Sequence, residues 1–146
     1  CARELLARAP KDYDYLLTAE AKSIPLIHEM ARQSGAKTYF IARKGLKVYL
    51  TDAIHVTVHS ITTQHEQDLY LGGEEAALIR GKRILIVDDV ISTGESLKAM
   101  EELVAEAGGT VAGRMAVLAE GDAQDRSDII YLEKLPVFNA DGTVKE

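Results

Sequence analysis

The chain has 146 residues, of which 47% are hydrophobic and 27% are charged, a mixture typical of one compact domain that buries its own core. Its formal net charge of −6 argues against broad binding to nucleic acid or to an anionic membrane, and no apolar run approaches membrane-spanning length. The single cysteine, Cys1, cannot form an internal disulfide, so a reducing, cytoplasmic setting is expected.

Short apolar runs rich in β-formers alternate with helix-patterned stretches, which indicates an α/β fold with a mainly parallel sheet flanked by helices. In chain order, the pattern predicts a helix over 1–8, a strand over 13–18, a helix over 24–34 that Gly35 ends, strands over 37–42, 54–59 and 68–71, a short helix over 74–77, a strand over 83–87, a helix over 96–104, and strands over 111–118 and 129–132. The polar run from Thr62 to Gln67 is expected to be the mobile tip of a hairpin. We expect residues 1–146 to form a single domain, and because its first helix begins without an entry turn or cap, we expect part of an N-terminal segment to be missing.

The strand over 83–87 is expected to be the most buried one, because four consecutive aliphatic residues suit a strand that is covered on both faces. It ends in Asp88 and Asp89, at the edge where open α/β sheets bind ligands, and adjacent carboxylates can accept hydrogen bonds from two vicinal hydroxyls. Three hydroxyl side chains and a glycine follow in 92–96, a composition that favours a tight turn whose N–H groups converge on one anion at the start of a helix. These parts together predict a sugar-phosphate site.

The segment from Ile84 to Ser96 closely resembles the signature of the type I phosphoribosyltransferases. By this resemblance, Asp88 and Asp89 contact the ribose 2′ and 3′ hydroxyls, act at the catalytic centre and help to place a substrate-bound Mg²⁺, a hard ion that prefers oxygen ligands. The residues that the resemblance assigns to 5-phosphoribosyl-1-diphosphate are Asp88, Asp89, Val90, Ile91, Ser92, Thr93, Gly94, Glu95 and Ser96. Glu95 departs from the glycine that adenine-type members often carry, and a side chain there can point outward.

The resemblance extends over most of the chain and is closest to the bacterial adenine-type and related purine enzymes. Residues 18–25 resemble the loop that holds pyrophosphate, and 42–47 resemble a basic stretch that in related dimers can reach the neighbouring subunit's pyrophosphate. The pyrophosphate contacts that this implies are Ala21, Lys22, Ser23, Arg43 and Lys47. Residues 60–71 resemble the flexible loop that closes over the reacting centre, where Glu66 and His65 are the candidates for proton transfer to the base. The missing N-terminal segment would belong to the hood that covers the base.

The function that the resemblance implies is transfer of a phosphoribosyl group to a purine in purine salvage, with adenine favoured over guanine, hypoxanthine and xanthine. It implies Mg²⁺ as the cofactor and a homodimer as the assembly, with no nucleic-acid or membrane partner. The alternative is a regulator that keeps the fold and binds the sugar diphosphate as an effector without turnover. The acidic chain lacks the basic face of a DNA-binding regulator, whereas an RNA-binding one stays open.

Several features of the sequence also fit other interpretations. Paired acids after a strand also occur in receiver domains, but there they lie near the start of the domain and no Ser-Thr-Gly turn follows them. His55 and His59 invite a metal hypothesis, yet in an extended strand their α-carbons lie about 13 Å apart, too far for easy co-ligation. The apolar residues within 131–138 suit either a base pocket or ordinary packing.

Overall fold

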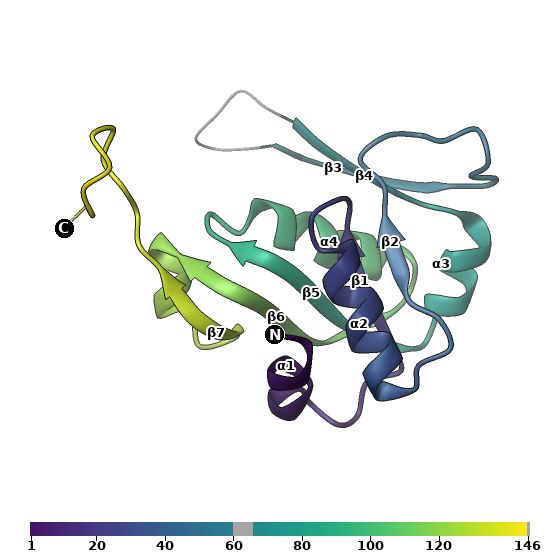
Figure 1. The fold of residues 1–146 in the computed structure, drawn as a ribbon. Coiled ribbons are helices and arrows are strands. Elements are labelled where there is room, and N and C mark those ends of the chain that lie inside the picture. Colours follow the sequence, from purple (N-terminus) through teal and green to yellow (C-terminus); the bar gives the residue numbers. More distant parts are fainter. Residues whose placement is uncertain (60–65, 146) are drawn as a thin grey trace.

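The computed structural model describes residues 1–59 and 66–145. Its centre is a five-stranded sheet with the order β2-β1-β5-β6-β7, in which every neighbouring pair is parallel (Figure 1). The elements are α1 (Ala2–Arg8), β1 (Tyr15–Ala19), α2 (Ile24–Ser34), β2 (Phe40–Ala42), β3 (Ile54–His59), β4 (Glu66–Leu71), α3 (Gly73–Ile79), β5 (Arg83–Ile91), α4 (Glu95–Glu106), β6 (Thr110–Glu120), the 3-10 helix η1 (Gly121–Asp125) and β7 (Ile130–Leu135). The predicted fold class, a mainly parallel sheet flanked by helices, is confirmed.

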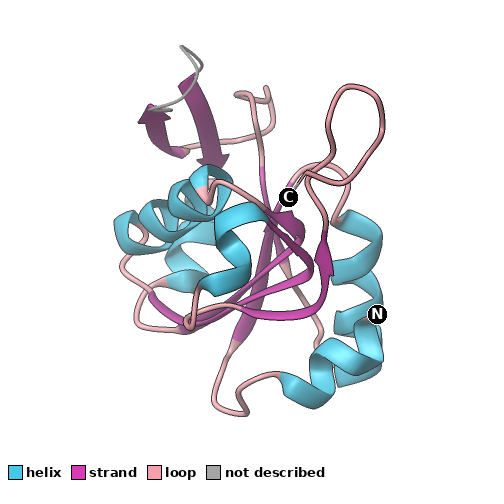
Figure 2. Cartoon of the chain, turned by 90° about the vertical axis from the view of Figure 1, so that its left-hand side faces the viewer, coloured by secondary structure: helices cyan, strands magenta, loops and turns pink. Residues whose placement is uncertain are grey.

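The central strand β5 packs against helices on both of its faces, as Figure 2 shows for the sheet as a whole. Ile84 and Ile86 point into a cluster with α3, α4 and the β3–β4 hairpin, while Leu85 and Val87 point into a second cluster with α1 and α2. All four side chains are fully buried. Because successive side chains of a strand point to opposite faces, burial on both sides requires the continuous aliphatic run that the sequence shows.

The strands β3 and β4 form a separate antiparallel hairpin that lies over α4 (Figure 1). Leu69 and Leu71 of β4 are fully buried, and Val58 of β3 joins them in the cluster beneath the hairpin. Paired backbone hydrogen bonds between Arg43 and Tyr70, of 2.9 and 2.8 Å, tie the hairpin to the residue that follows β2. The hairpin is therefore attached at the same edge of the sheet as the predicted site.

Several predicted boundaries were confirmed and others were wrong. The helix α2 spans the predicted residues, and Gly35 ends it in the left-handed conformation with φ of 73°. Glu66 and Gln67 belong to β4, so the prediction that they lie in the tip of the hairpin was wrong, while the predicted tip residues 62–65 lie outside the described part of the chain. Within the described residues, no helix is both long and apolar enough to cross a membrane.

Candidate functional site

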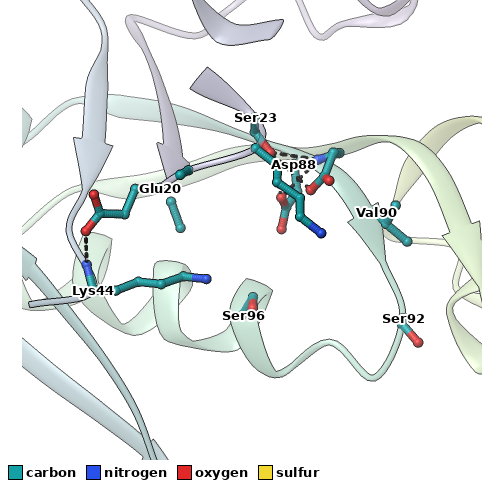
Figure 3. A pocket seen from close by; sticks show the side chains of 11 residues that line it. Glu20, Ser23, Lys44, Asp88, Val90, Ser92 and Ser96 are labelled. Atoms are coloured by element: carbon teal, nitrogen blue, oxygen red, sulfur yellow. Dashed lines mark hydrogen bonds between the residues drawn. The ribbon is translucent and has the colours of Figure 1, made fainter. Parts of the chain in front are cut away.

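The candidate site lies at the carboxyl edge of the sheet, between β1 and β5. From this pair the strand order runs outward to β2 on one side and to β6 and β7 on the other, so the chain connections diverge there and leave a crevice. An open cavity of about 630 Å³ occupies this position (Figure 3). It is lined by Ala19, Glu20, Ala21, Lys22, Ser23, Lys44, Asp88, Asp89, Val90, Ser92 and Ser96.

The two acids of β5 are held by a serine of the predicted pyrophosphate loop. Ser23 Oγ lies 2.8 Å from Asp88 Oδ1 and 3.2 Å from Asp89 Oδ1, and it accepts a hydrogen bond of 2.9 Å from the backbone N–H of Asp89. Ser23 precedes α2, yet its hydroxyl makes no capping bond to that helix. Its side chain is only 1% exposed. Ser23 therefore connects the loop after β1 to the acid pair, a contact in addition to the backbone amide contact that the resemblance implies.

Burial separates the protonation behaviour of the two acids. Loss of hydration raises the pKa of Asp88 to about 6, and the neighbouring Asp89 adds to this rise. Partial burial acts in the same direction on Asp89, but the hydrogen bonds that it accepts from Asp88 and from backbone N–H groups outweigh burial and lower its pKa. The pair therefore shares a proton more readily than two solvated carboxylates do.

Asp88→Asn is expected to stabilise the ligand-free protein at pH 7.5 by about 1–3 kcal/mol, while stability at pH 3.5 changes little. The folded protein holds the Asp88 proton more tightly than the unfolded chain does, since the pKa rises from 3.8 to about 6. The contribution of Asp88 to the free energy of unfolding is therefore most favourable below pH 3.8 and is lost as the pH rises through about 6. Urea unfolding at the two pH values measures the difference. Equal stability of variant and wild type at pH 7.5 would show that burial of the ionised Asp88 carboxylate does not destabilise the folded protein.

The turn after β5 encloses a small hollow of about 110 Å³, lined by Asp88 and residues 90–97. Gly94 stands at the start of α4 with φ of 82°, a conformation that favours glycine. The first N–H groups of a helix have no acceptor within it and attract anions. The side chain of Ile91 is buried in the core, so this residue can contribute only its backbone to a ligand.

Arg126 packs against this turn at Gly94. A Cβ atom added to Gly94 would lie 2.8 Å from Arg126 Nη1, so the guanidinium packs directly against the glycine. Asp128 fixes the guanidinium through two hydrogen bonds of 2.9 and 2.8 Å. Arg126 lies beyond η1, more than thirty residues from the turn in the sequence, which is why local patterns did not reveal it.

The opposite end of the cavity carries the basic residues. Lys44 lines the cavity, and its side chain extends into it from the side of Glu20, as Figure 3 shows. Its backbone N–H donates a hydrogen bond of 2.7 Å to Glu20, which is the main cause of the lowered pKa of that carboxyl. Glu20 also pairs with Arg43 at 3.4 Å. Glu20 therefore joins the loop after β1 to the basic stretch after β2.

The structure brings most, but not all, of the predicted site residues together. Ala21, Lys22 and Ser23 line the same cavity as the acid pair. Arg43 and Lys47, the predicted pyrophosphate contacts of the basic stretch, are not among its lining residues, and Lys44 takes that place. Their assignment remains a prediction.

Glu66, one of the two predicted proton-transfer residues, lies in β4, and His55 and His59 lie in β3. Glu66 is largely exposed and pairs with His59 across the hairpin at 3.2 Å, whereas His65 lies outside the described residues. His55 contacts Asp68 at 2.9 Å and stacks on Tyr70. In the described ranges 1–59 and 66–145, no group of three or more His, Cys, Asp or Glu side chains gathers to hold a metal ion.

The apolar residues near the C-terminus divide into two groups. Tyr131 packs against the core and donates a hydrogen bond of 2.9 Å to the carbonyl of Gln124, and Leu132 packs against the second core cluster. Phe138 and Val144 are more than half exposed and face each other in a short β-bridge. Packing therefore accounts for the first group, while the second remains accessible.

Comparison of the chain with known proteins finds a matching family. Residues 2–144 match the family described as phosphoribosyl transferase domain. A hypoxanthine/guanine phosphoribosyltransferase of Methanothermococcus okinawensis is 30% identical over 144 residues, covering 94% of this chain and 74% of the relative. A xanthine phosphoribosyltransferase of Bifidobacterium adolescentis is 35% identical over 104 residues, covering 70% of this chain and 53% of the relative. The chain thus spans between about half and three quarters of these curated relatives.

Solved structures show the same fold at lower sequence identity. The adenine phosphoribosyltransferase of Thermoanaerobacter pseudethanolicus superimposes with a TM-score of 0.73 at 23% identity, covering 92% of this chain and 78% of the other. At this level of identity the likeness concerns the arrangement of the helices and strands.

Proposed function

The chain belongs to the phosphoribosyl transferase family, and we propose that it transfers the phosphoribosyl group of 5-phosphoribosyl-1-diphosphate to a purine base. One observation carries the proposal: the cavity that holds the carboxylate pair is also lined by Lys22 and Lys44, and it shares Asp88, Val90, Ser92 and Ser96 with the hollow of the turn at the start of α4. A sugar that carries a phosphate at one end and a diphosphate at the other matches this order of groups.

In the proposed reaction, a ring nitrogen of the base forms a bond to the anomeric carbon while the bond from that carbon to the diphosphate oxygen breaks. The nitrogen loses its proton, and pyrophosphate leaves. The role of the protein is to position the substrate and to stabilise charge. Asp88 and Asp89 fix the ribose through its hydroxyls, residues 92–96 fix the 5′-phosphate, and the two lysines offset the charge that develops on the leaving group.

Mg²⁺ fits the carboxylate oxygens of the acid pair as an ion shared with the substrate. In proteins this ion is commonly bound through one or two carboxylates together with substrate phosphates, and Asp88 and Asp89 supply two carboxylates beside the lysine side of the cavity. When bound, Mg²⁺ would neutralise the leaving pyrophosphate.

We also propose that the protein forms a homodimer, as the family resemblance implies. Light scattering measures the mass of the assembly.

Adenine and the 6-oxopurines are the candidate bases. The resemblance over most of the chain favours adenine, whereas the curated relatives carry names of hypoxanthine/guanine and xanthine enzymes. A second cavity, of about 490 Å³, lies between the hairpin, the phosphate turn and the start of η1, and its lining includes His59 and Asp122. Because the resemblance and the names of the relatives point to different purines, we propose a purine as the substrate class. A measurement of turnover with each purine decides among them.

The protein is expected to release pyrophosphate when it is incubated with 5-phosphoribosyl-1-diphosphate, Mg²⁺ and one purine of a panel of adenine, guanine, hypoxanthine and xanthine. Turnover with one base, absent when the base is omitted, supports the proposal and identifies the substrate. Binding of the sugar diphosphate without turnover of any base would contradict the proposal and favour the effector-binding regulator.

A further inference from the structure

Gln67 of the hairpin contacts the turn to which the proposed function assigns the 5′-phosphate. Its Nε2 donates a hydrogen bond of 3.0 Å to Ser96 Oγ, and Ser96 Oγ lies 3.2 Å from Gln67 Oε1. The two residues are 29 positions apart in the sequence, and both are partly buried. One side-chain amide therefore offers both a donor and an acceptor to one hydroxyl of the anion-binding turn.

The folding of β4 explains why the amide faces this way. Side chains of a strand alternate between faces, so Gln67 lies on the same face as Leu69 and Leu71, which are fully buried beneath the hairpin. Its cross-strand partner, Val58, is buried on that face as well. Gln67 is thus the polar end of an apolar stripe, and it meets the first turn of α4 where the stripe reaches the site.

The chemistry of the pair depends on a single proton. A serine hydroxyl has one proton to donate and two lone pairs with which to accept, whereas a phosphate dianion only accepts. When phosphate occupies the turn, the Ser96 proton has to leave Gln67 Oε1 and point to the phosphate. The Gln67 N–H can continue to donate to Ser96 Oγ, which occupies an acceptor site of the hydroxyl and directs its proton outward.

We propose that Gln67 is a positioning residue that orients the Ser96 hydroxyl toward the 5′-phosphate of the substrate. The inference rests on the proposed function, because it assigns the 5′-phosphate to residues 92–96. Gln67 acts through Ser96 and has no contact with the reacting carbon in this account. Its effect should therefore fall on the affinity for the phosphorylated sugar and not on the chemical step.

Two variants of Gln67 separate a hydrogen-bond role from a packing role. Gln67→Glu keeps the shape but replaces the N–H donor with a second acceptor and adds negative charge near the phosphate, while Gln67→Ala removes both groups. We expect the dissociation constant of ribose 5-phosphate to rise about fivefold in Gln67→Ala and at least about twentyfold in Gln67→Glu. The KM for 5-phosphoribosyl-1-diphosphate should rise in parallel, with kcat within about twofold of wild type.

The controls use a second ligand, a second background and a remote site. Affinity for inorganic pyrophosphate should stay unchanged in both variants, because it binds at the other end of the cavity. In the Ser96→Ala background, Gln67→Ala should have no further effect on ribose 5-phosphate, as expected of two groups that act as one unit. Gln33→Glu, on the exposed surface of α2, makes the same chemical change and should leave both affinities as they are.

Isothermal titration calorimetry measures all of these affinities. Wild-type affinity for ribose 5-phosphate in Gln67→Glu would overturn the inference, and so would an equal loss of ribose 5-phosphate and pyrophosphate binding, which is the result of a displaced hairpin. Failure of the wild-type protein to bind ribose 5-phosphate at all would instead overturn the proposed function. The two failures are therefore distinguishable.

Discussion

Replacing Asp88 and Asp89 together by Asn is expected to abolish binding of 5-phosphoribosyl-1-diphosphate while the protein stays folded. Each carboxylate would lose a charge-assisted hydrogen bond to a ribose hydroxyl, worth about 1.5–3 kcal/mol, so the pair should weaken binding by a factor of at least about 100. The amide retains an acceptor for the Ser23 hydroxyl, which preserves the local packing. Calorimetric titration measures the affinity, and circular dichroism monitors the fold.

A matched pair of aspartates at the other end of the sheet serves as the control for charge. Asp12 and Asp14 lie before β1 and contact Arg83, at the amino edge of the strands. Their double Asn variant also removes two negative charges and should bind the sugar diphosphate as the wild type does. Unchanged affinity in the Asp88 and Asp89 variant would contradict the role assigned to the acid pair.

Gly94→Ala is expected to reduce affinity for ribose 5-phosphate by a factor of at least about 10, because the turn has to change its shape. A left-handed conformation costs a residue with a Cβ atom about 1–2 kcal/mol. The added Cβ would also lie 2.8 Å from Arg126 Nη1, and Asp128 restrains that guanidinium through two hydrogen bonds. Either the turn or this ion pair must shift, and calorimetric titration of ribose 5-phosphate detects the result.

Gly108→Ala provides the control for backbone strain. Gly108 has the same φ of 82°, follows the far end of α4 and would place its Cβ 3.4 Å from a flexible side-chain atom of Arg80. Both variants should lose similar stability in urea unfolding, but only Gly94→Ala should lose affinity. Equal affinities in the two variants would show that the shape of the turn at residue 94 does not matter for the phosphate.

The fold could be predicted from the sequence wherever local signals and burial agree. The aliphatic run of residues 84–87 specified the buried part of β5, although the strand continues through the acid pair to Ile91; the Ser-Thr-Gly turn specified the start of α4, and Gly35 specified the end of α2. The strand β2 has three residues and is shorter than predicted; in the described part of the chain it lies at the edge of the main sheet and pairs with β1.

The parts of the site that escaped prediction depend on contacts between distant segments. Ser23 was predicted only as a contact to pyrophosphate, and the sequence did not indicate that its hydroxyl would bond to Asp88, 65 residues away. Gln67 looked like part of a polar tip, because a glutamine next to a polar run carries no sign of the strand face on which it lies. Arg126 lies in a segment without a motif, and the arrangement of β6 and η1 in the folded protein places its side chain against the turn. Such contacts follow from the tertiary arrangement and have no local signature.

A crystal structure of the protein with bound 5-phosphoribosyl-1-diphosphate would test the assignment of the cavity most directly. We expect the 5′-phosphate within the turn of residues 92–96, the ribose hydroxyls on Asp88 and Asp89, and the diphosphate beside Lys22 and Lys44. A sugar diphosphate bound elsewhere on the protein, with that turn empty, would contradict it.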